Sequence, residues 1–410
     1  MDFNALLALM VQKNSFDLFI TAGRAPTMKI DGTFVEVSKT FLSKEQALAL
    51  VLSLMEARQK EEFYKTKECL FAIGVPKVGR FRVSAFIQRD AAGMVLHRIK
   101  NDIPEIDTLD LPEILKSLAL EKRGLVLFAG PLGSGKSTTL SSVIQYRNEN
   151  SSGHMIVLDD PMEYMHSHRG CIVTQREVGL DTESYEIALK NALQQSPNVV
   201  SLGEICTREA MQIVISIVNS GCLCLSTLHA NNAEQTIEAI LNFFPDDMHR
   251  QIRIDLARNL RGIVSQQMLI CSNGKKHVIA EVLINTPAVQ DAIRKGDTQR
   301  FKELMIKGRD VGMQSFDQAR CNLFLQKKIS YEDAIESAEY KNEFRLMVKQ
   351  ALEGMENNQL QETIAAEEQN DSVASSEQEN KLPNLLASKE MTLSDVHDDS
   401  SDAGSIFTHR

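Results

Sequence analysis

The sequence predicts an α/β fold, and three observations support it. An apolar run at residues 125–128 leads into a glycine-rich segment, 130–137, with the spacing G-x-x-x-x-G-K-[ST]. Further along the chain, short apolar runs alternate with helical patterns. Each run is followed at once by polar side chains. This order is typical of a wound parallel sheet that carries its site at the carboxyl ends of the strands.

The first hundred residues predict a small, separate α+β domain. Residues 28–37 contain an Asp-Gly pair between β-prone arms, which predicts a hairpin. Residues 43–64 are dense in Leu, Ala, Glu and Lys and predict one or two helices. A second hairpin is expected from strands at 81–85 and 94–99, connected through 91–93. We therefore expect a domain at 1–100 and a linker at 101–112, which contains Pro104 and Pro112.

The glycine-rich segment predicts a phosphate-binding loop between a strand and a helix that begins near Lys136. Its glycines let successive backbone amides approach phosphate oxygens, and the helix N-terminus adds partial positive charge. Lys136 is expected to contact the β and γ phosphates of ATP, and Ser137 to bind Mg²⁺. The residues predicted to bind the nucleotide are Gly130, Pro131, Leu132, Gly133, Ser134, Gly135, Lys136, Ser137 and Thr138.

Three further strands are predicted at 154–158, 199–202 and 223–227, with a helix at 184–195. Their ends present acidic residues and a histidine, which are Asp159, Asp160, Glu163, Glu204 and His229. Nucleotide hydrolysis needs a metal ion and a group that orients water, and either glutamate fits those roles. Two alternatives stay open. Residues 159–163 are also compatible with a solvated loop, and His229 either senses the γ phosphate or caps its strand.

Composition narrows the class of protein. Residues 351–410 carry 13 Asp and Glu against 3 Lys and Arg, so the tail accounts for the whole net charge of −10 and residues 1–350 are neutral. The tail composition predicts a disordered acidic segment, which we place at 356–410, after an ATPase domain at 113–355. A neutral core without a basic run argues against nucleic acid as a partner. Scattered cysteines, no export signal and no apolar run of membrane-spanning length favour the cytoplasm.

Taken together, the motifs resemble the secretion ATPase superfamily of type IV pili and type II secretion. The matching segments are a Walker A loop at 130–138, an aspartate box at 159–164, a Walker B motif ending at 202–205 and a histidine box at 227–229. Within the superfamily, the chain resembles the pilus retraction ATPases of the PilT/PilU family and is nearest to the PilU branch. The resemblance covers about residues 5–350.

The resemblance implies a PAS-like N-terminal domain, a RecA-like P-loop ATPase domain and a homo-oligomer, a hexamer, that hydrolyses ATP with Mg²⁺ between subunits. It also implies pilus retraction and twitching motility, at the inner face of the cytoplasmic membrane, beneath the pilus platform protein and with a partner retraction ATPase. Glu163 would activate water, and Glu204 would help to hold Mg²⁺. An arginine supplied by a neighbouring subunit is expected among Arg80, Arg82, Arg89 and Arg98, with Arg82 and Arg98 preferred. A solvated strand face is the alternative reading of these arginines.

The chain departs from the family pattern at three positions that we expect to lie near the nucleotide. Cys206 stands where the family has Arg, and Asn219 and Cys222 stand where it has Glu and His. We therefore hypothesise that hydrolysis is slowed or depends on a partner ring. Three functions follow: an autonomous retraction motor, an accessory subunit with weak intrinsic hydrolysis, and an extension ATPase. The last is disfavoured because the chain has no C-x-x-C metal module.

Overall fold

The fold was analysed in a computed structural model, which describes residues 3–30, 32–100 and 102–353. The chain divides into two compact units, 1–344 and 345–410. Of the second unit, only residues 345–353 are described, and they are helical. The acidic tail predicted at 356–410 and the turn residue Asp31 lie outside the described residues. The domain boundaries at 100, 112 and 355 stay predictions.

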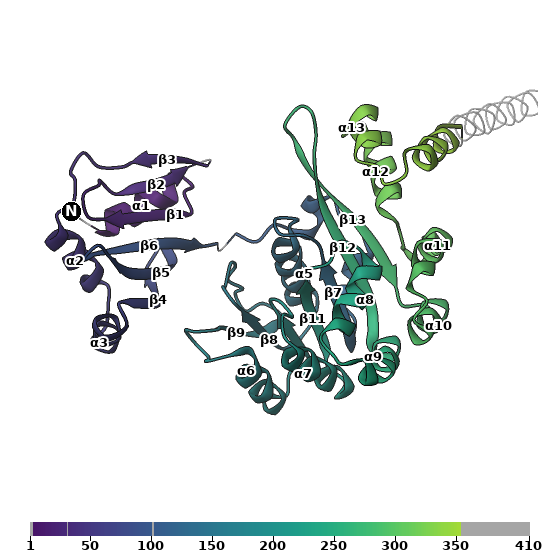
Figure 1. Ribbon diagram of the computed structural model, residues 1–410, viewed down its shortest axis with the longest axis horizontal. Coiled ribbons are helices and arrows are strands. Elements are labelled where there is room, and N and C mark those ends of the chain that lie inside the picture. The colour runs from purple at the N-terminus through teal and green to yellow at the C-terminus, as the bar shows by residue number, and fades with distance from the viewer. Residues whose placement is uncertain (1–2, 31, 101, 354–410) are drawn as a thin grey trace, which may run out of the picture. The chain divides into compact units, whose positions relative to one another are not determined.

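The N-terminal part of the first unit is built on a six-stranded antiparallel sheet (Figure 1). Its strand order is β3-β2-β1-β6-β5-β4, so the two predicted hairpins are joined through β1 and β6. In β5, Phe81, Val83 and Ala85 are buried while the residues between them are more exposed, as the alternation predicts. The strands are β1 (Asp17–Thr21), β2 (Thr27–Ile30), β3 (Thr33–Glu36), β4 (Glu68–Val75), β5 (Gly79–Gln88) and β6 (Ala91–Ile99).

Helices α1 (Phe3–Gln12), α2 (Lys44–Ser53) and α3 (Ala57–Thr66) contribute to the core of this sheet. The connection predicted at 91–93 is wrong, because these residues begin β6. The turn lies at Arg89 and Asp90, whose φ angles of 47° and 60° suit a two-residue hairpin. Gly93 is instead required inside the strand, because a Cβ there would lie 2.9 Å from the Phe86 ring.

The second sheet has seven strands in the order β13-β12-β7-β11-β10-β8-β9. All neighbours are parallel except the antiparallel pair β12 and β13. Strand β7, which leads into the phosphate loop, therefore lies inside the sheet between β12 and β11. The strands are β7 (Gly124–Ala129), β8 (Gly153–Asp159), β9 (Cys171–Glu177), β10 (Val199–Leu202), β11 (Leu223–Leu228), β12 (Leu260–Ile270) and β13 (Lys276–Ile284).

Both faces of this sheet are buried. Leu125, Leu127 and Ala129 of β7 join the core formed with α6 to α11, whereas Val126 and Phe128 join the core formed with α4 and α5. The helices are α4 (Ile114–Ala119), α5 (Lys136–Asn150), α6 (Tyr185–Ala192), α7 (Arg208–Asn219), α8 (Ala233–Asn242), α9 (Asp246–Asn259), α10 (Pro287–Lys295), α11 (Phe301–Lys307), α12 (Phe316–Leu325) and α13 (Tyr331–Glu336). Short 3₁₀ turns are η1 (Ile106–Leu109), η2 (Leu193–Gln195), η3 (Thr298–Arg300) and η4 (Arg309–Val311).

The predicted α/β class, with a RecA-like parallel sheet after a small α+β part, is confirmed. The strands expected at 154–158, 199–202 and 223–227 are β8, β10 and β11. Strands β1, β4, β9, β12 and β13 were not predicted. Among the described residues, none of the helices combines the length and the apolar character that a membrane crossing requires.

Candidate nucleotide site

The phosphate loop connects β7 to α5 and is closely packed against β12. Gly130 has φ +151°, and a Cβ there would lie 2.5 Å from the carbonyl oxygen of Gln266. Gly133 has φ +78° and open space around it, so it is required by its backbone conformation alone. Gly135 is the N-cap of α5, and the first-turn amides of this helix are thus available to an anion.

Lys136 begins α5 and folds back over the loop. Its Nζ donates to the carbonyl oxygens of Gly130, at 2.7 Å, and Pro131, at 3.0 Å. Burial lowers the pKa of Lys136, and the Glu204 carboxylate acts in the opposite direction. The ammonium group is thereby held inside the concave face of the loop, where phosphate oxygens bind in proteins of this type.

His229 joins the phosphate loop to the Walker B segment. Its Nδ1 lies 3.3 Å from Lys136 Nζ, and its Nε2 lies 3.1 Å from Glu204 Oε1. Nδ1 also lies 3.4 Å from the Gly130 carbonyl oxygen. Because an ammonium group only donates, Nδ1 accepts from Lys136 in the tautomer protonated at Nε2, and Nε2 then donates to the carboxylate. Lys136, His229 and Glu204 therefore form one continuous chain of hydrogen bonds.

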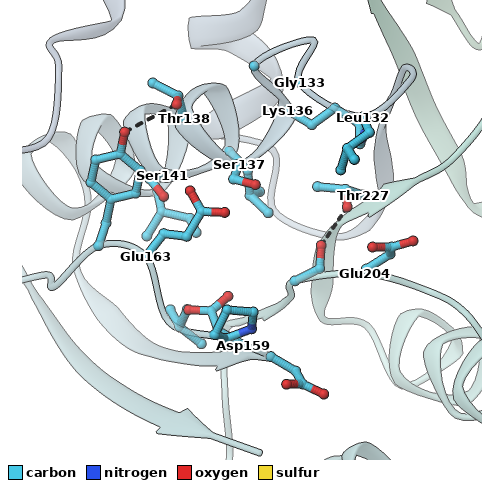
Figure 2. Close-up of a pocket in the computed structure, with 18 of the residues that line it drawn as sticks. Leu132, Gly133, Lys136, Ser137, Thr138, Ser141, Asp159, Glu163, Glu204 and Thr227 are labelled. Carbon is cyan, nitrogen blue, oxygen red and sulfur yellow. Dashed lines mark hydrogen bonds between the residues drawn. The ribbon is translucent and has the colours of Figure 1, made fainter. Parts of the chain in front are cut away.

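The strand ends that carry Glu204 and His229 are tied to each other. Thr227 Oγ1 donates to the Gly203 carbonyl oxygen at 2.6 Å, and Ser226 Oγ donates to the Leu202 carbonyl oxygen at 2.8 Å. Both bonds join β11 to β10, and Figure 2 shows the first of them beside Glu204. The separation between the glutamate and the histidine is thus set by the sheet.

The aspartate box follows β8 on the other side of the site. Asp159 ends the strand, and burial, followed by the charges of Glu163 and Glu177, raises its pKa to about 7. Glu163 is exposed and points toward the first turns of α5 near Ser137 and Ser141 (Figure 2). A hydrogen bond of 3.1 Å between the Tyr164 hydroxyl and Thr138 Oγ1 holds the two segments together.

These elements enclose a cavity of about 650 Å³. The predicted residues that line it are Leu132, Gly133, Gly135, Lys136, Ser137, Thr138, Glu163, Glu204 and His229. Gly130, Pro131 and Ser134 do not line it, although the first two supply the carbonyls that hold Lys136. The three predicted catalytic residues and the loop therefore share one cavity.

The expectation that Asn219 and Cys222 lie near the nucleotide is wrong. Both precede β11, whose first residue, Leu223, pairs with Gly124 at the start of β7. The phosphate loop follows the opposite end of β7, about 17–20 Å away for strands of this length. Asn219 accepts from Asn259, and Cys222 Sγ contacts the Pro197 carbonyl oxygen. Of the three departures, only Cys206 is close to the site, where its thiol interacts with Glu204.

The four candidate arginines lie on β5, β6 and the turn between them. Arg82 Nη1 lies 3.8 Å from Glu177 Oε1 of the same chain, and Glu177 is buried at the end of β9. Arg98 is half-buried, and Arg89 occupies the hairpin turn. The choice among them as a donor to a neighbouring subunit stays a prediction.

Several residues of the cavity were not singled out from the sequence. Ser141 and Met268 line it, as does His166, whose pKa burial lowers to about 4. Tyr164, which was predicted from the sequence only as the end of the aspartate box and without a role, lines it too. Gln266 Nε2 donates to Thr139 Oγ1 behind the loop at 2.9 Å. The available signal was that residue 164 ends the aspartate box and residue 166 follows it, whereas no sequence pattern connects β12 to the loop.

Comparisons with known proteins agree with this geometry. The family model described as "Type II/IV secretion system protein" matches residues 4–389. The chain is 53% identical over 350 residues to "Type IV pilus ATPase PilU" of Pseudomonas aeruginosa, covering 85% of this chain and 92% of the relative. It is 33% identical over 344 residues to "Type IV pilus retractation ATPase PilT" of the same organism, covering 84% of this chain and all of the relative.

Among solved structures, the chain is similar to the "Crystal Structure of the Pilus Retraction Motor PilT and Bound ADP". The TM-score is 0.76 at 34% sequence identity, with 84% of this chain and 98% of the solved chain covered. That protein was solved with ADP bound, and the similarity extends over nearly all of its chain.

Proposed function

The chain belongs to the type II/IV secretion system protein family, and from that premise we propose that it is an ATP-hydrolysing motor subunit for type IV pilus retraction and twitching motility. The observation that carries the proposal is the hydrogen-bond chain from Lys136 through His229 to Glu204. It joins the phosphate loop to the carboxylate of the Walker B segment. The names of the PilU and PilT relatives supply the pilus system.

In the proposed site, ATP phosphates bind to the loop amides and to the N-terminus of α5. Lys136 contributes a positive charge against the β and γ phosphates. In the structure, the lysine is already held by the loop carbonyls of Gly130 and Pro131. Stabilisation of this preorganised kind is the largest contribution to phosphoryl transfer.

Mg²⁺ fits the residues that face the cavity. Ser137 has an exposed hydroxyl in the first turn of α5, and Glu204 is partly exposed across the same cavity. One hydroxyl and one carboxylate suit Mg²⁺, which takes its other ligands from phosphates and water. The ion would neutralise charge on the phosphates. We assign Ser137 to it directly and Glu204 through a bound water.

Glu163 is the proposed activator of the attacking water. Its carboxylate is exposed to the cavity and points toward the helix that holds the phosphates. Glu204 is less available for that task because it accepts a hydrogen bond from His229. His229 would instead hold Glu204 in place and link its position to the lysine that contacts the γ phosphate.

The proposed working form is a homohexamer with nucleotide between neighbouring subunits and an arginine, Arg82 or Arg98, supplied by the neighbour. We place this ring at the inner face of the cytoplasmic membrane, beneath the pilus platform protein and with a second retraction ATPase as partner. The support for this arrangement is the family resemblance together with the PilT neighbour.

ATP turnover by the purified oligomer tests the proposal. Lys136→Ala and Glu204→Ala should each lower kcat by about 100-fold or more, because each removes a group directed at the phosphates or the metal. Glu209→Gln is the matched control, since Glu209 is exposed on α7 outside the cavity. Wild-type turnover that survives in Lys136→Ala would contradict the assignment of the site.

A second candidate function is a nucleotide-binding accessory subunit with weak intrinsic hydrolysis that depends on a partner ATPase. Cys206 favours it, because this position beside Glu204 carries Arg in the family pattern. Cys206→Arg separates the two readings. An increase of kcat to the level of an autonomous motor supports the accessory role, whereas high wild-type turnover that the variant does not increase supports the motor.

A further inference from the structure

A buried carboxylate on β13 contacts the segment that follows His229. Glu281 is 8% exposed, and its Oε1 accepts a hydrogen bond of 2.8 Å from the backbone amide of Ala233. Ala233 is the first residue of α8, and only three residues separate it from His229. The contact therefore joins a residue of the outer strand to the turn that carries the histidine.

The turn has few other anchors. Within residues 229–235, Asn232 Oδ1 accepts from the Gln235 amide at 2.8 Å, and Gln235 Oε1 accepts from the Asn231 amide at 3.2 Å. Both bonds are local to the turn and the first turn of α8. Side chains of this segment also contact other elements: His229 contacts Lys136, Gly130 and Glu204, and Glu234 Oε1 accepts from Thr298 Oγ1 at 3.3 Å. Glu281 supplies a bond from a different element to the backbone of the turn, and a carboxylate at a helix N-terminus is also favoured by the helix dipole.

The sheet places Glu281 level with the phosphate loop. Glu281 pairs with Ser265 of β12, and Ser265 pairs with Ala129, the last residue of β7. The carbonyl of the next residue of β12, Gln266, contacts the loop at Gly130. Neighbouring residues on three adjacent strands therefore contact both the phosphate loop, through Gln266, and the turn that carries His229, through Glu281.

We propose that Glu281 is a positioning residue of the nucleotide site, which holds the 229–232 turn so that His229 bridges Lys136 and Glu204. This inference rests on the proposed function. Glu281 does not line the cavity and acts only through the turn. Loss of its contact is expected to lower kcat more than it raises KM, because the phosphate loop itself is left intact.

The charged groups that act on Glu281 come from three other segments. They are Glu339, Lys302 and Arg320. Burial raises the pKa of Glu281 to about 7, and the charge of Glu339 acts in the same direction, whereas the Ala233 amide, Ser265 and Lys302 act in the opposite direction. The ionised form binds the Ala233 amide more strongly than the protonated form does. The contribution of Glu281 to kcat should therefore rise between pH 6 and pH 8, and a glutamine at this position should remove that rise.

Two variants and a matched control test the proposal on the full chain. Glu281→Gln keeps a carbonyl acceptor without the charge, whereas Glu281→Leu removes the acceptor, so kcat should fall in the order wild type, Gln, Leu. Glu238→Gln, on the exposed face of α8, should leave kcat unchanged. A fall in kcat of about 10-fold or more for Glu281→Leu, with KM for ATP changed less than about twofold, is the expected result.

Two further measurements isolate the mechanism. Hydrogen exchange at 229–235 should accelerate in Glu281→Leu, whereas exchange in β8 should not. In a His229→Ala background, Glu281→Leu should cause no additional loss of kcat, since residues that act through one another are not additive. Unchanged exchange at the turn, or additive losses, would overturn the proposal.

The proposed function and the role of Glu281 are tested by different measurements. Wild-type chain without turnover above Lys136→Ala would count against the ATPase, and the exchange measurement would still decide whether Glu281 holds the turn.

Discussion

Gly130 and Gly133 belong to the same loop but meet different surroundings. Gly130→Ala would force a Cβ against the Gln266 carbonyl, whereas Gly133→Ala meets no atom within 4 Å and has only the strain of a left-handed backbone, about 1–2 kcal/mol. We expect Gly130→Ala to weaken ATP binding far more than Gly133→Ala. Titration with a fluorescent ATP analogue gives both affinities, and equal losses would contradict this reading of the loop.

The buried position of Glu281 also predicts a pH dependence of stability. Its pKa is about 7 in the folded chain, against an ordinary value of 4.5, so the folded state binds the proton more tightly. Stability from this group therefore falls as pH rises from about 4.5 to about 7, by on the order of 3 kcal/mol. Glu281→Gln should melt at the wild-type temperature near pH 4 and above it at pH 8.

Thermal melts at both pH values check this expectation, with Glu238→Gln as the control. A Glu281→Gln chain that is less stable than wild type at pH 8 would show that the charge stabilises the fold. The expected combination, greater stability with lower kcat, is the trade-off typical of residues retained for activity.

At the scale of secondary-structure elements, two helices begin with the same capping box in different environments. Ser315 caps α12 with Gln318 and is 5% exposed, whereas Ser43 caps α2 with Gln46 at an exposed position. Ser315→Ala should cost about 1–2 kcal/mol, because it leaves a buried amide without an acceptor. Ser43→Ala should cost less, since water replaces the lost bond. Urea unfolding of both variants measures the difference, and equal costs would contradict it.

Elements with strong local patterns were predictable, and elements defined by distant partners were not. Strands β8, β10 and β11 are continuous apolar runs that end in polar residues, so their place at the site followed from parallel pairing. Strand β12 pairs with β7 across about 130 residues of chain, and nothing local connects Gln266 to Gly130. The one available signal for Glu281 was a single acidic residue inside the apolar run of β13.

The error over Asn219 and Cys222 has a related cause. Asn219 and Cys222 are close to His229 in the sequence, but they precede strand β11 and His229 follows it. The six residues of this strand therefore place them at opposite ends of the strand. Proximity along a strand is therefore a poor guide to proximity at a site. Residues just after a strand, such as Glu204, lie in the same cavity because the carboxyl ends of parallel strands meet.

At the scale of the whole molecule, the acidic excess lies in a tail that is distant in sequence from the residues of the nucleotide site. Residues 356–410 carry 12 Asp and Glu against 3 Lys and Arg, whereas the residues of the cavity, Glu281 and the proposed arginines at 82 and 98 all precede residue 282. We expect a chain that ends at residue 355 to hydrolyse ATP at the full-length rate and to bind an anion-exchange column more weakly. Loss of turnover on truncation would assign the tail a part in the reaction.

The contact between Gly130 and Gln266 has a consequence for building hybrids of related motors. The loop and strand β12 are separated by about 130 residues of sequence, yet each fills space that the other leaves. A loop transplanted alone from a homologue would arrive without the surface that shapes it. A functional exchange therefore requires the β12–β13 hairpin to be exchanged together with the loop, as one structural unit.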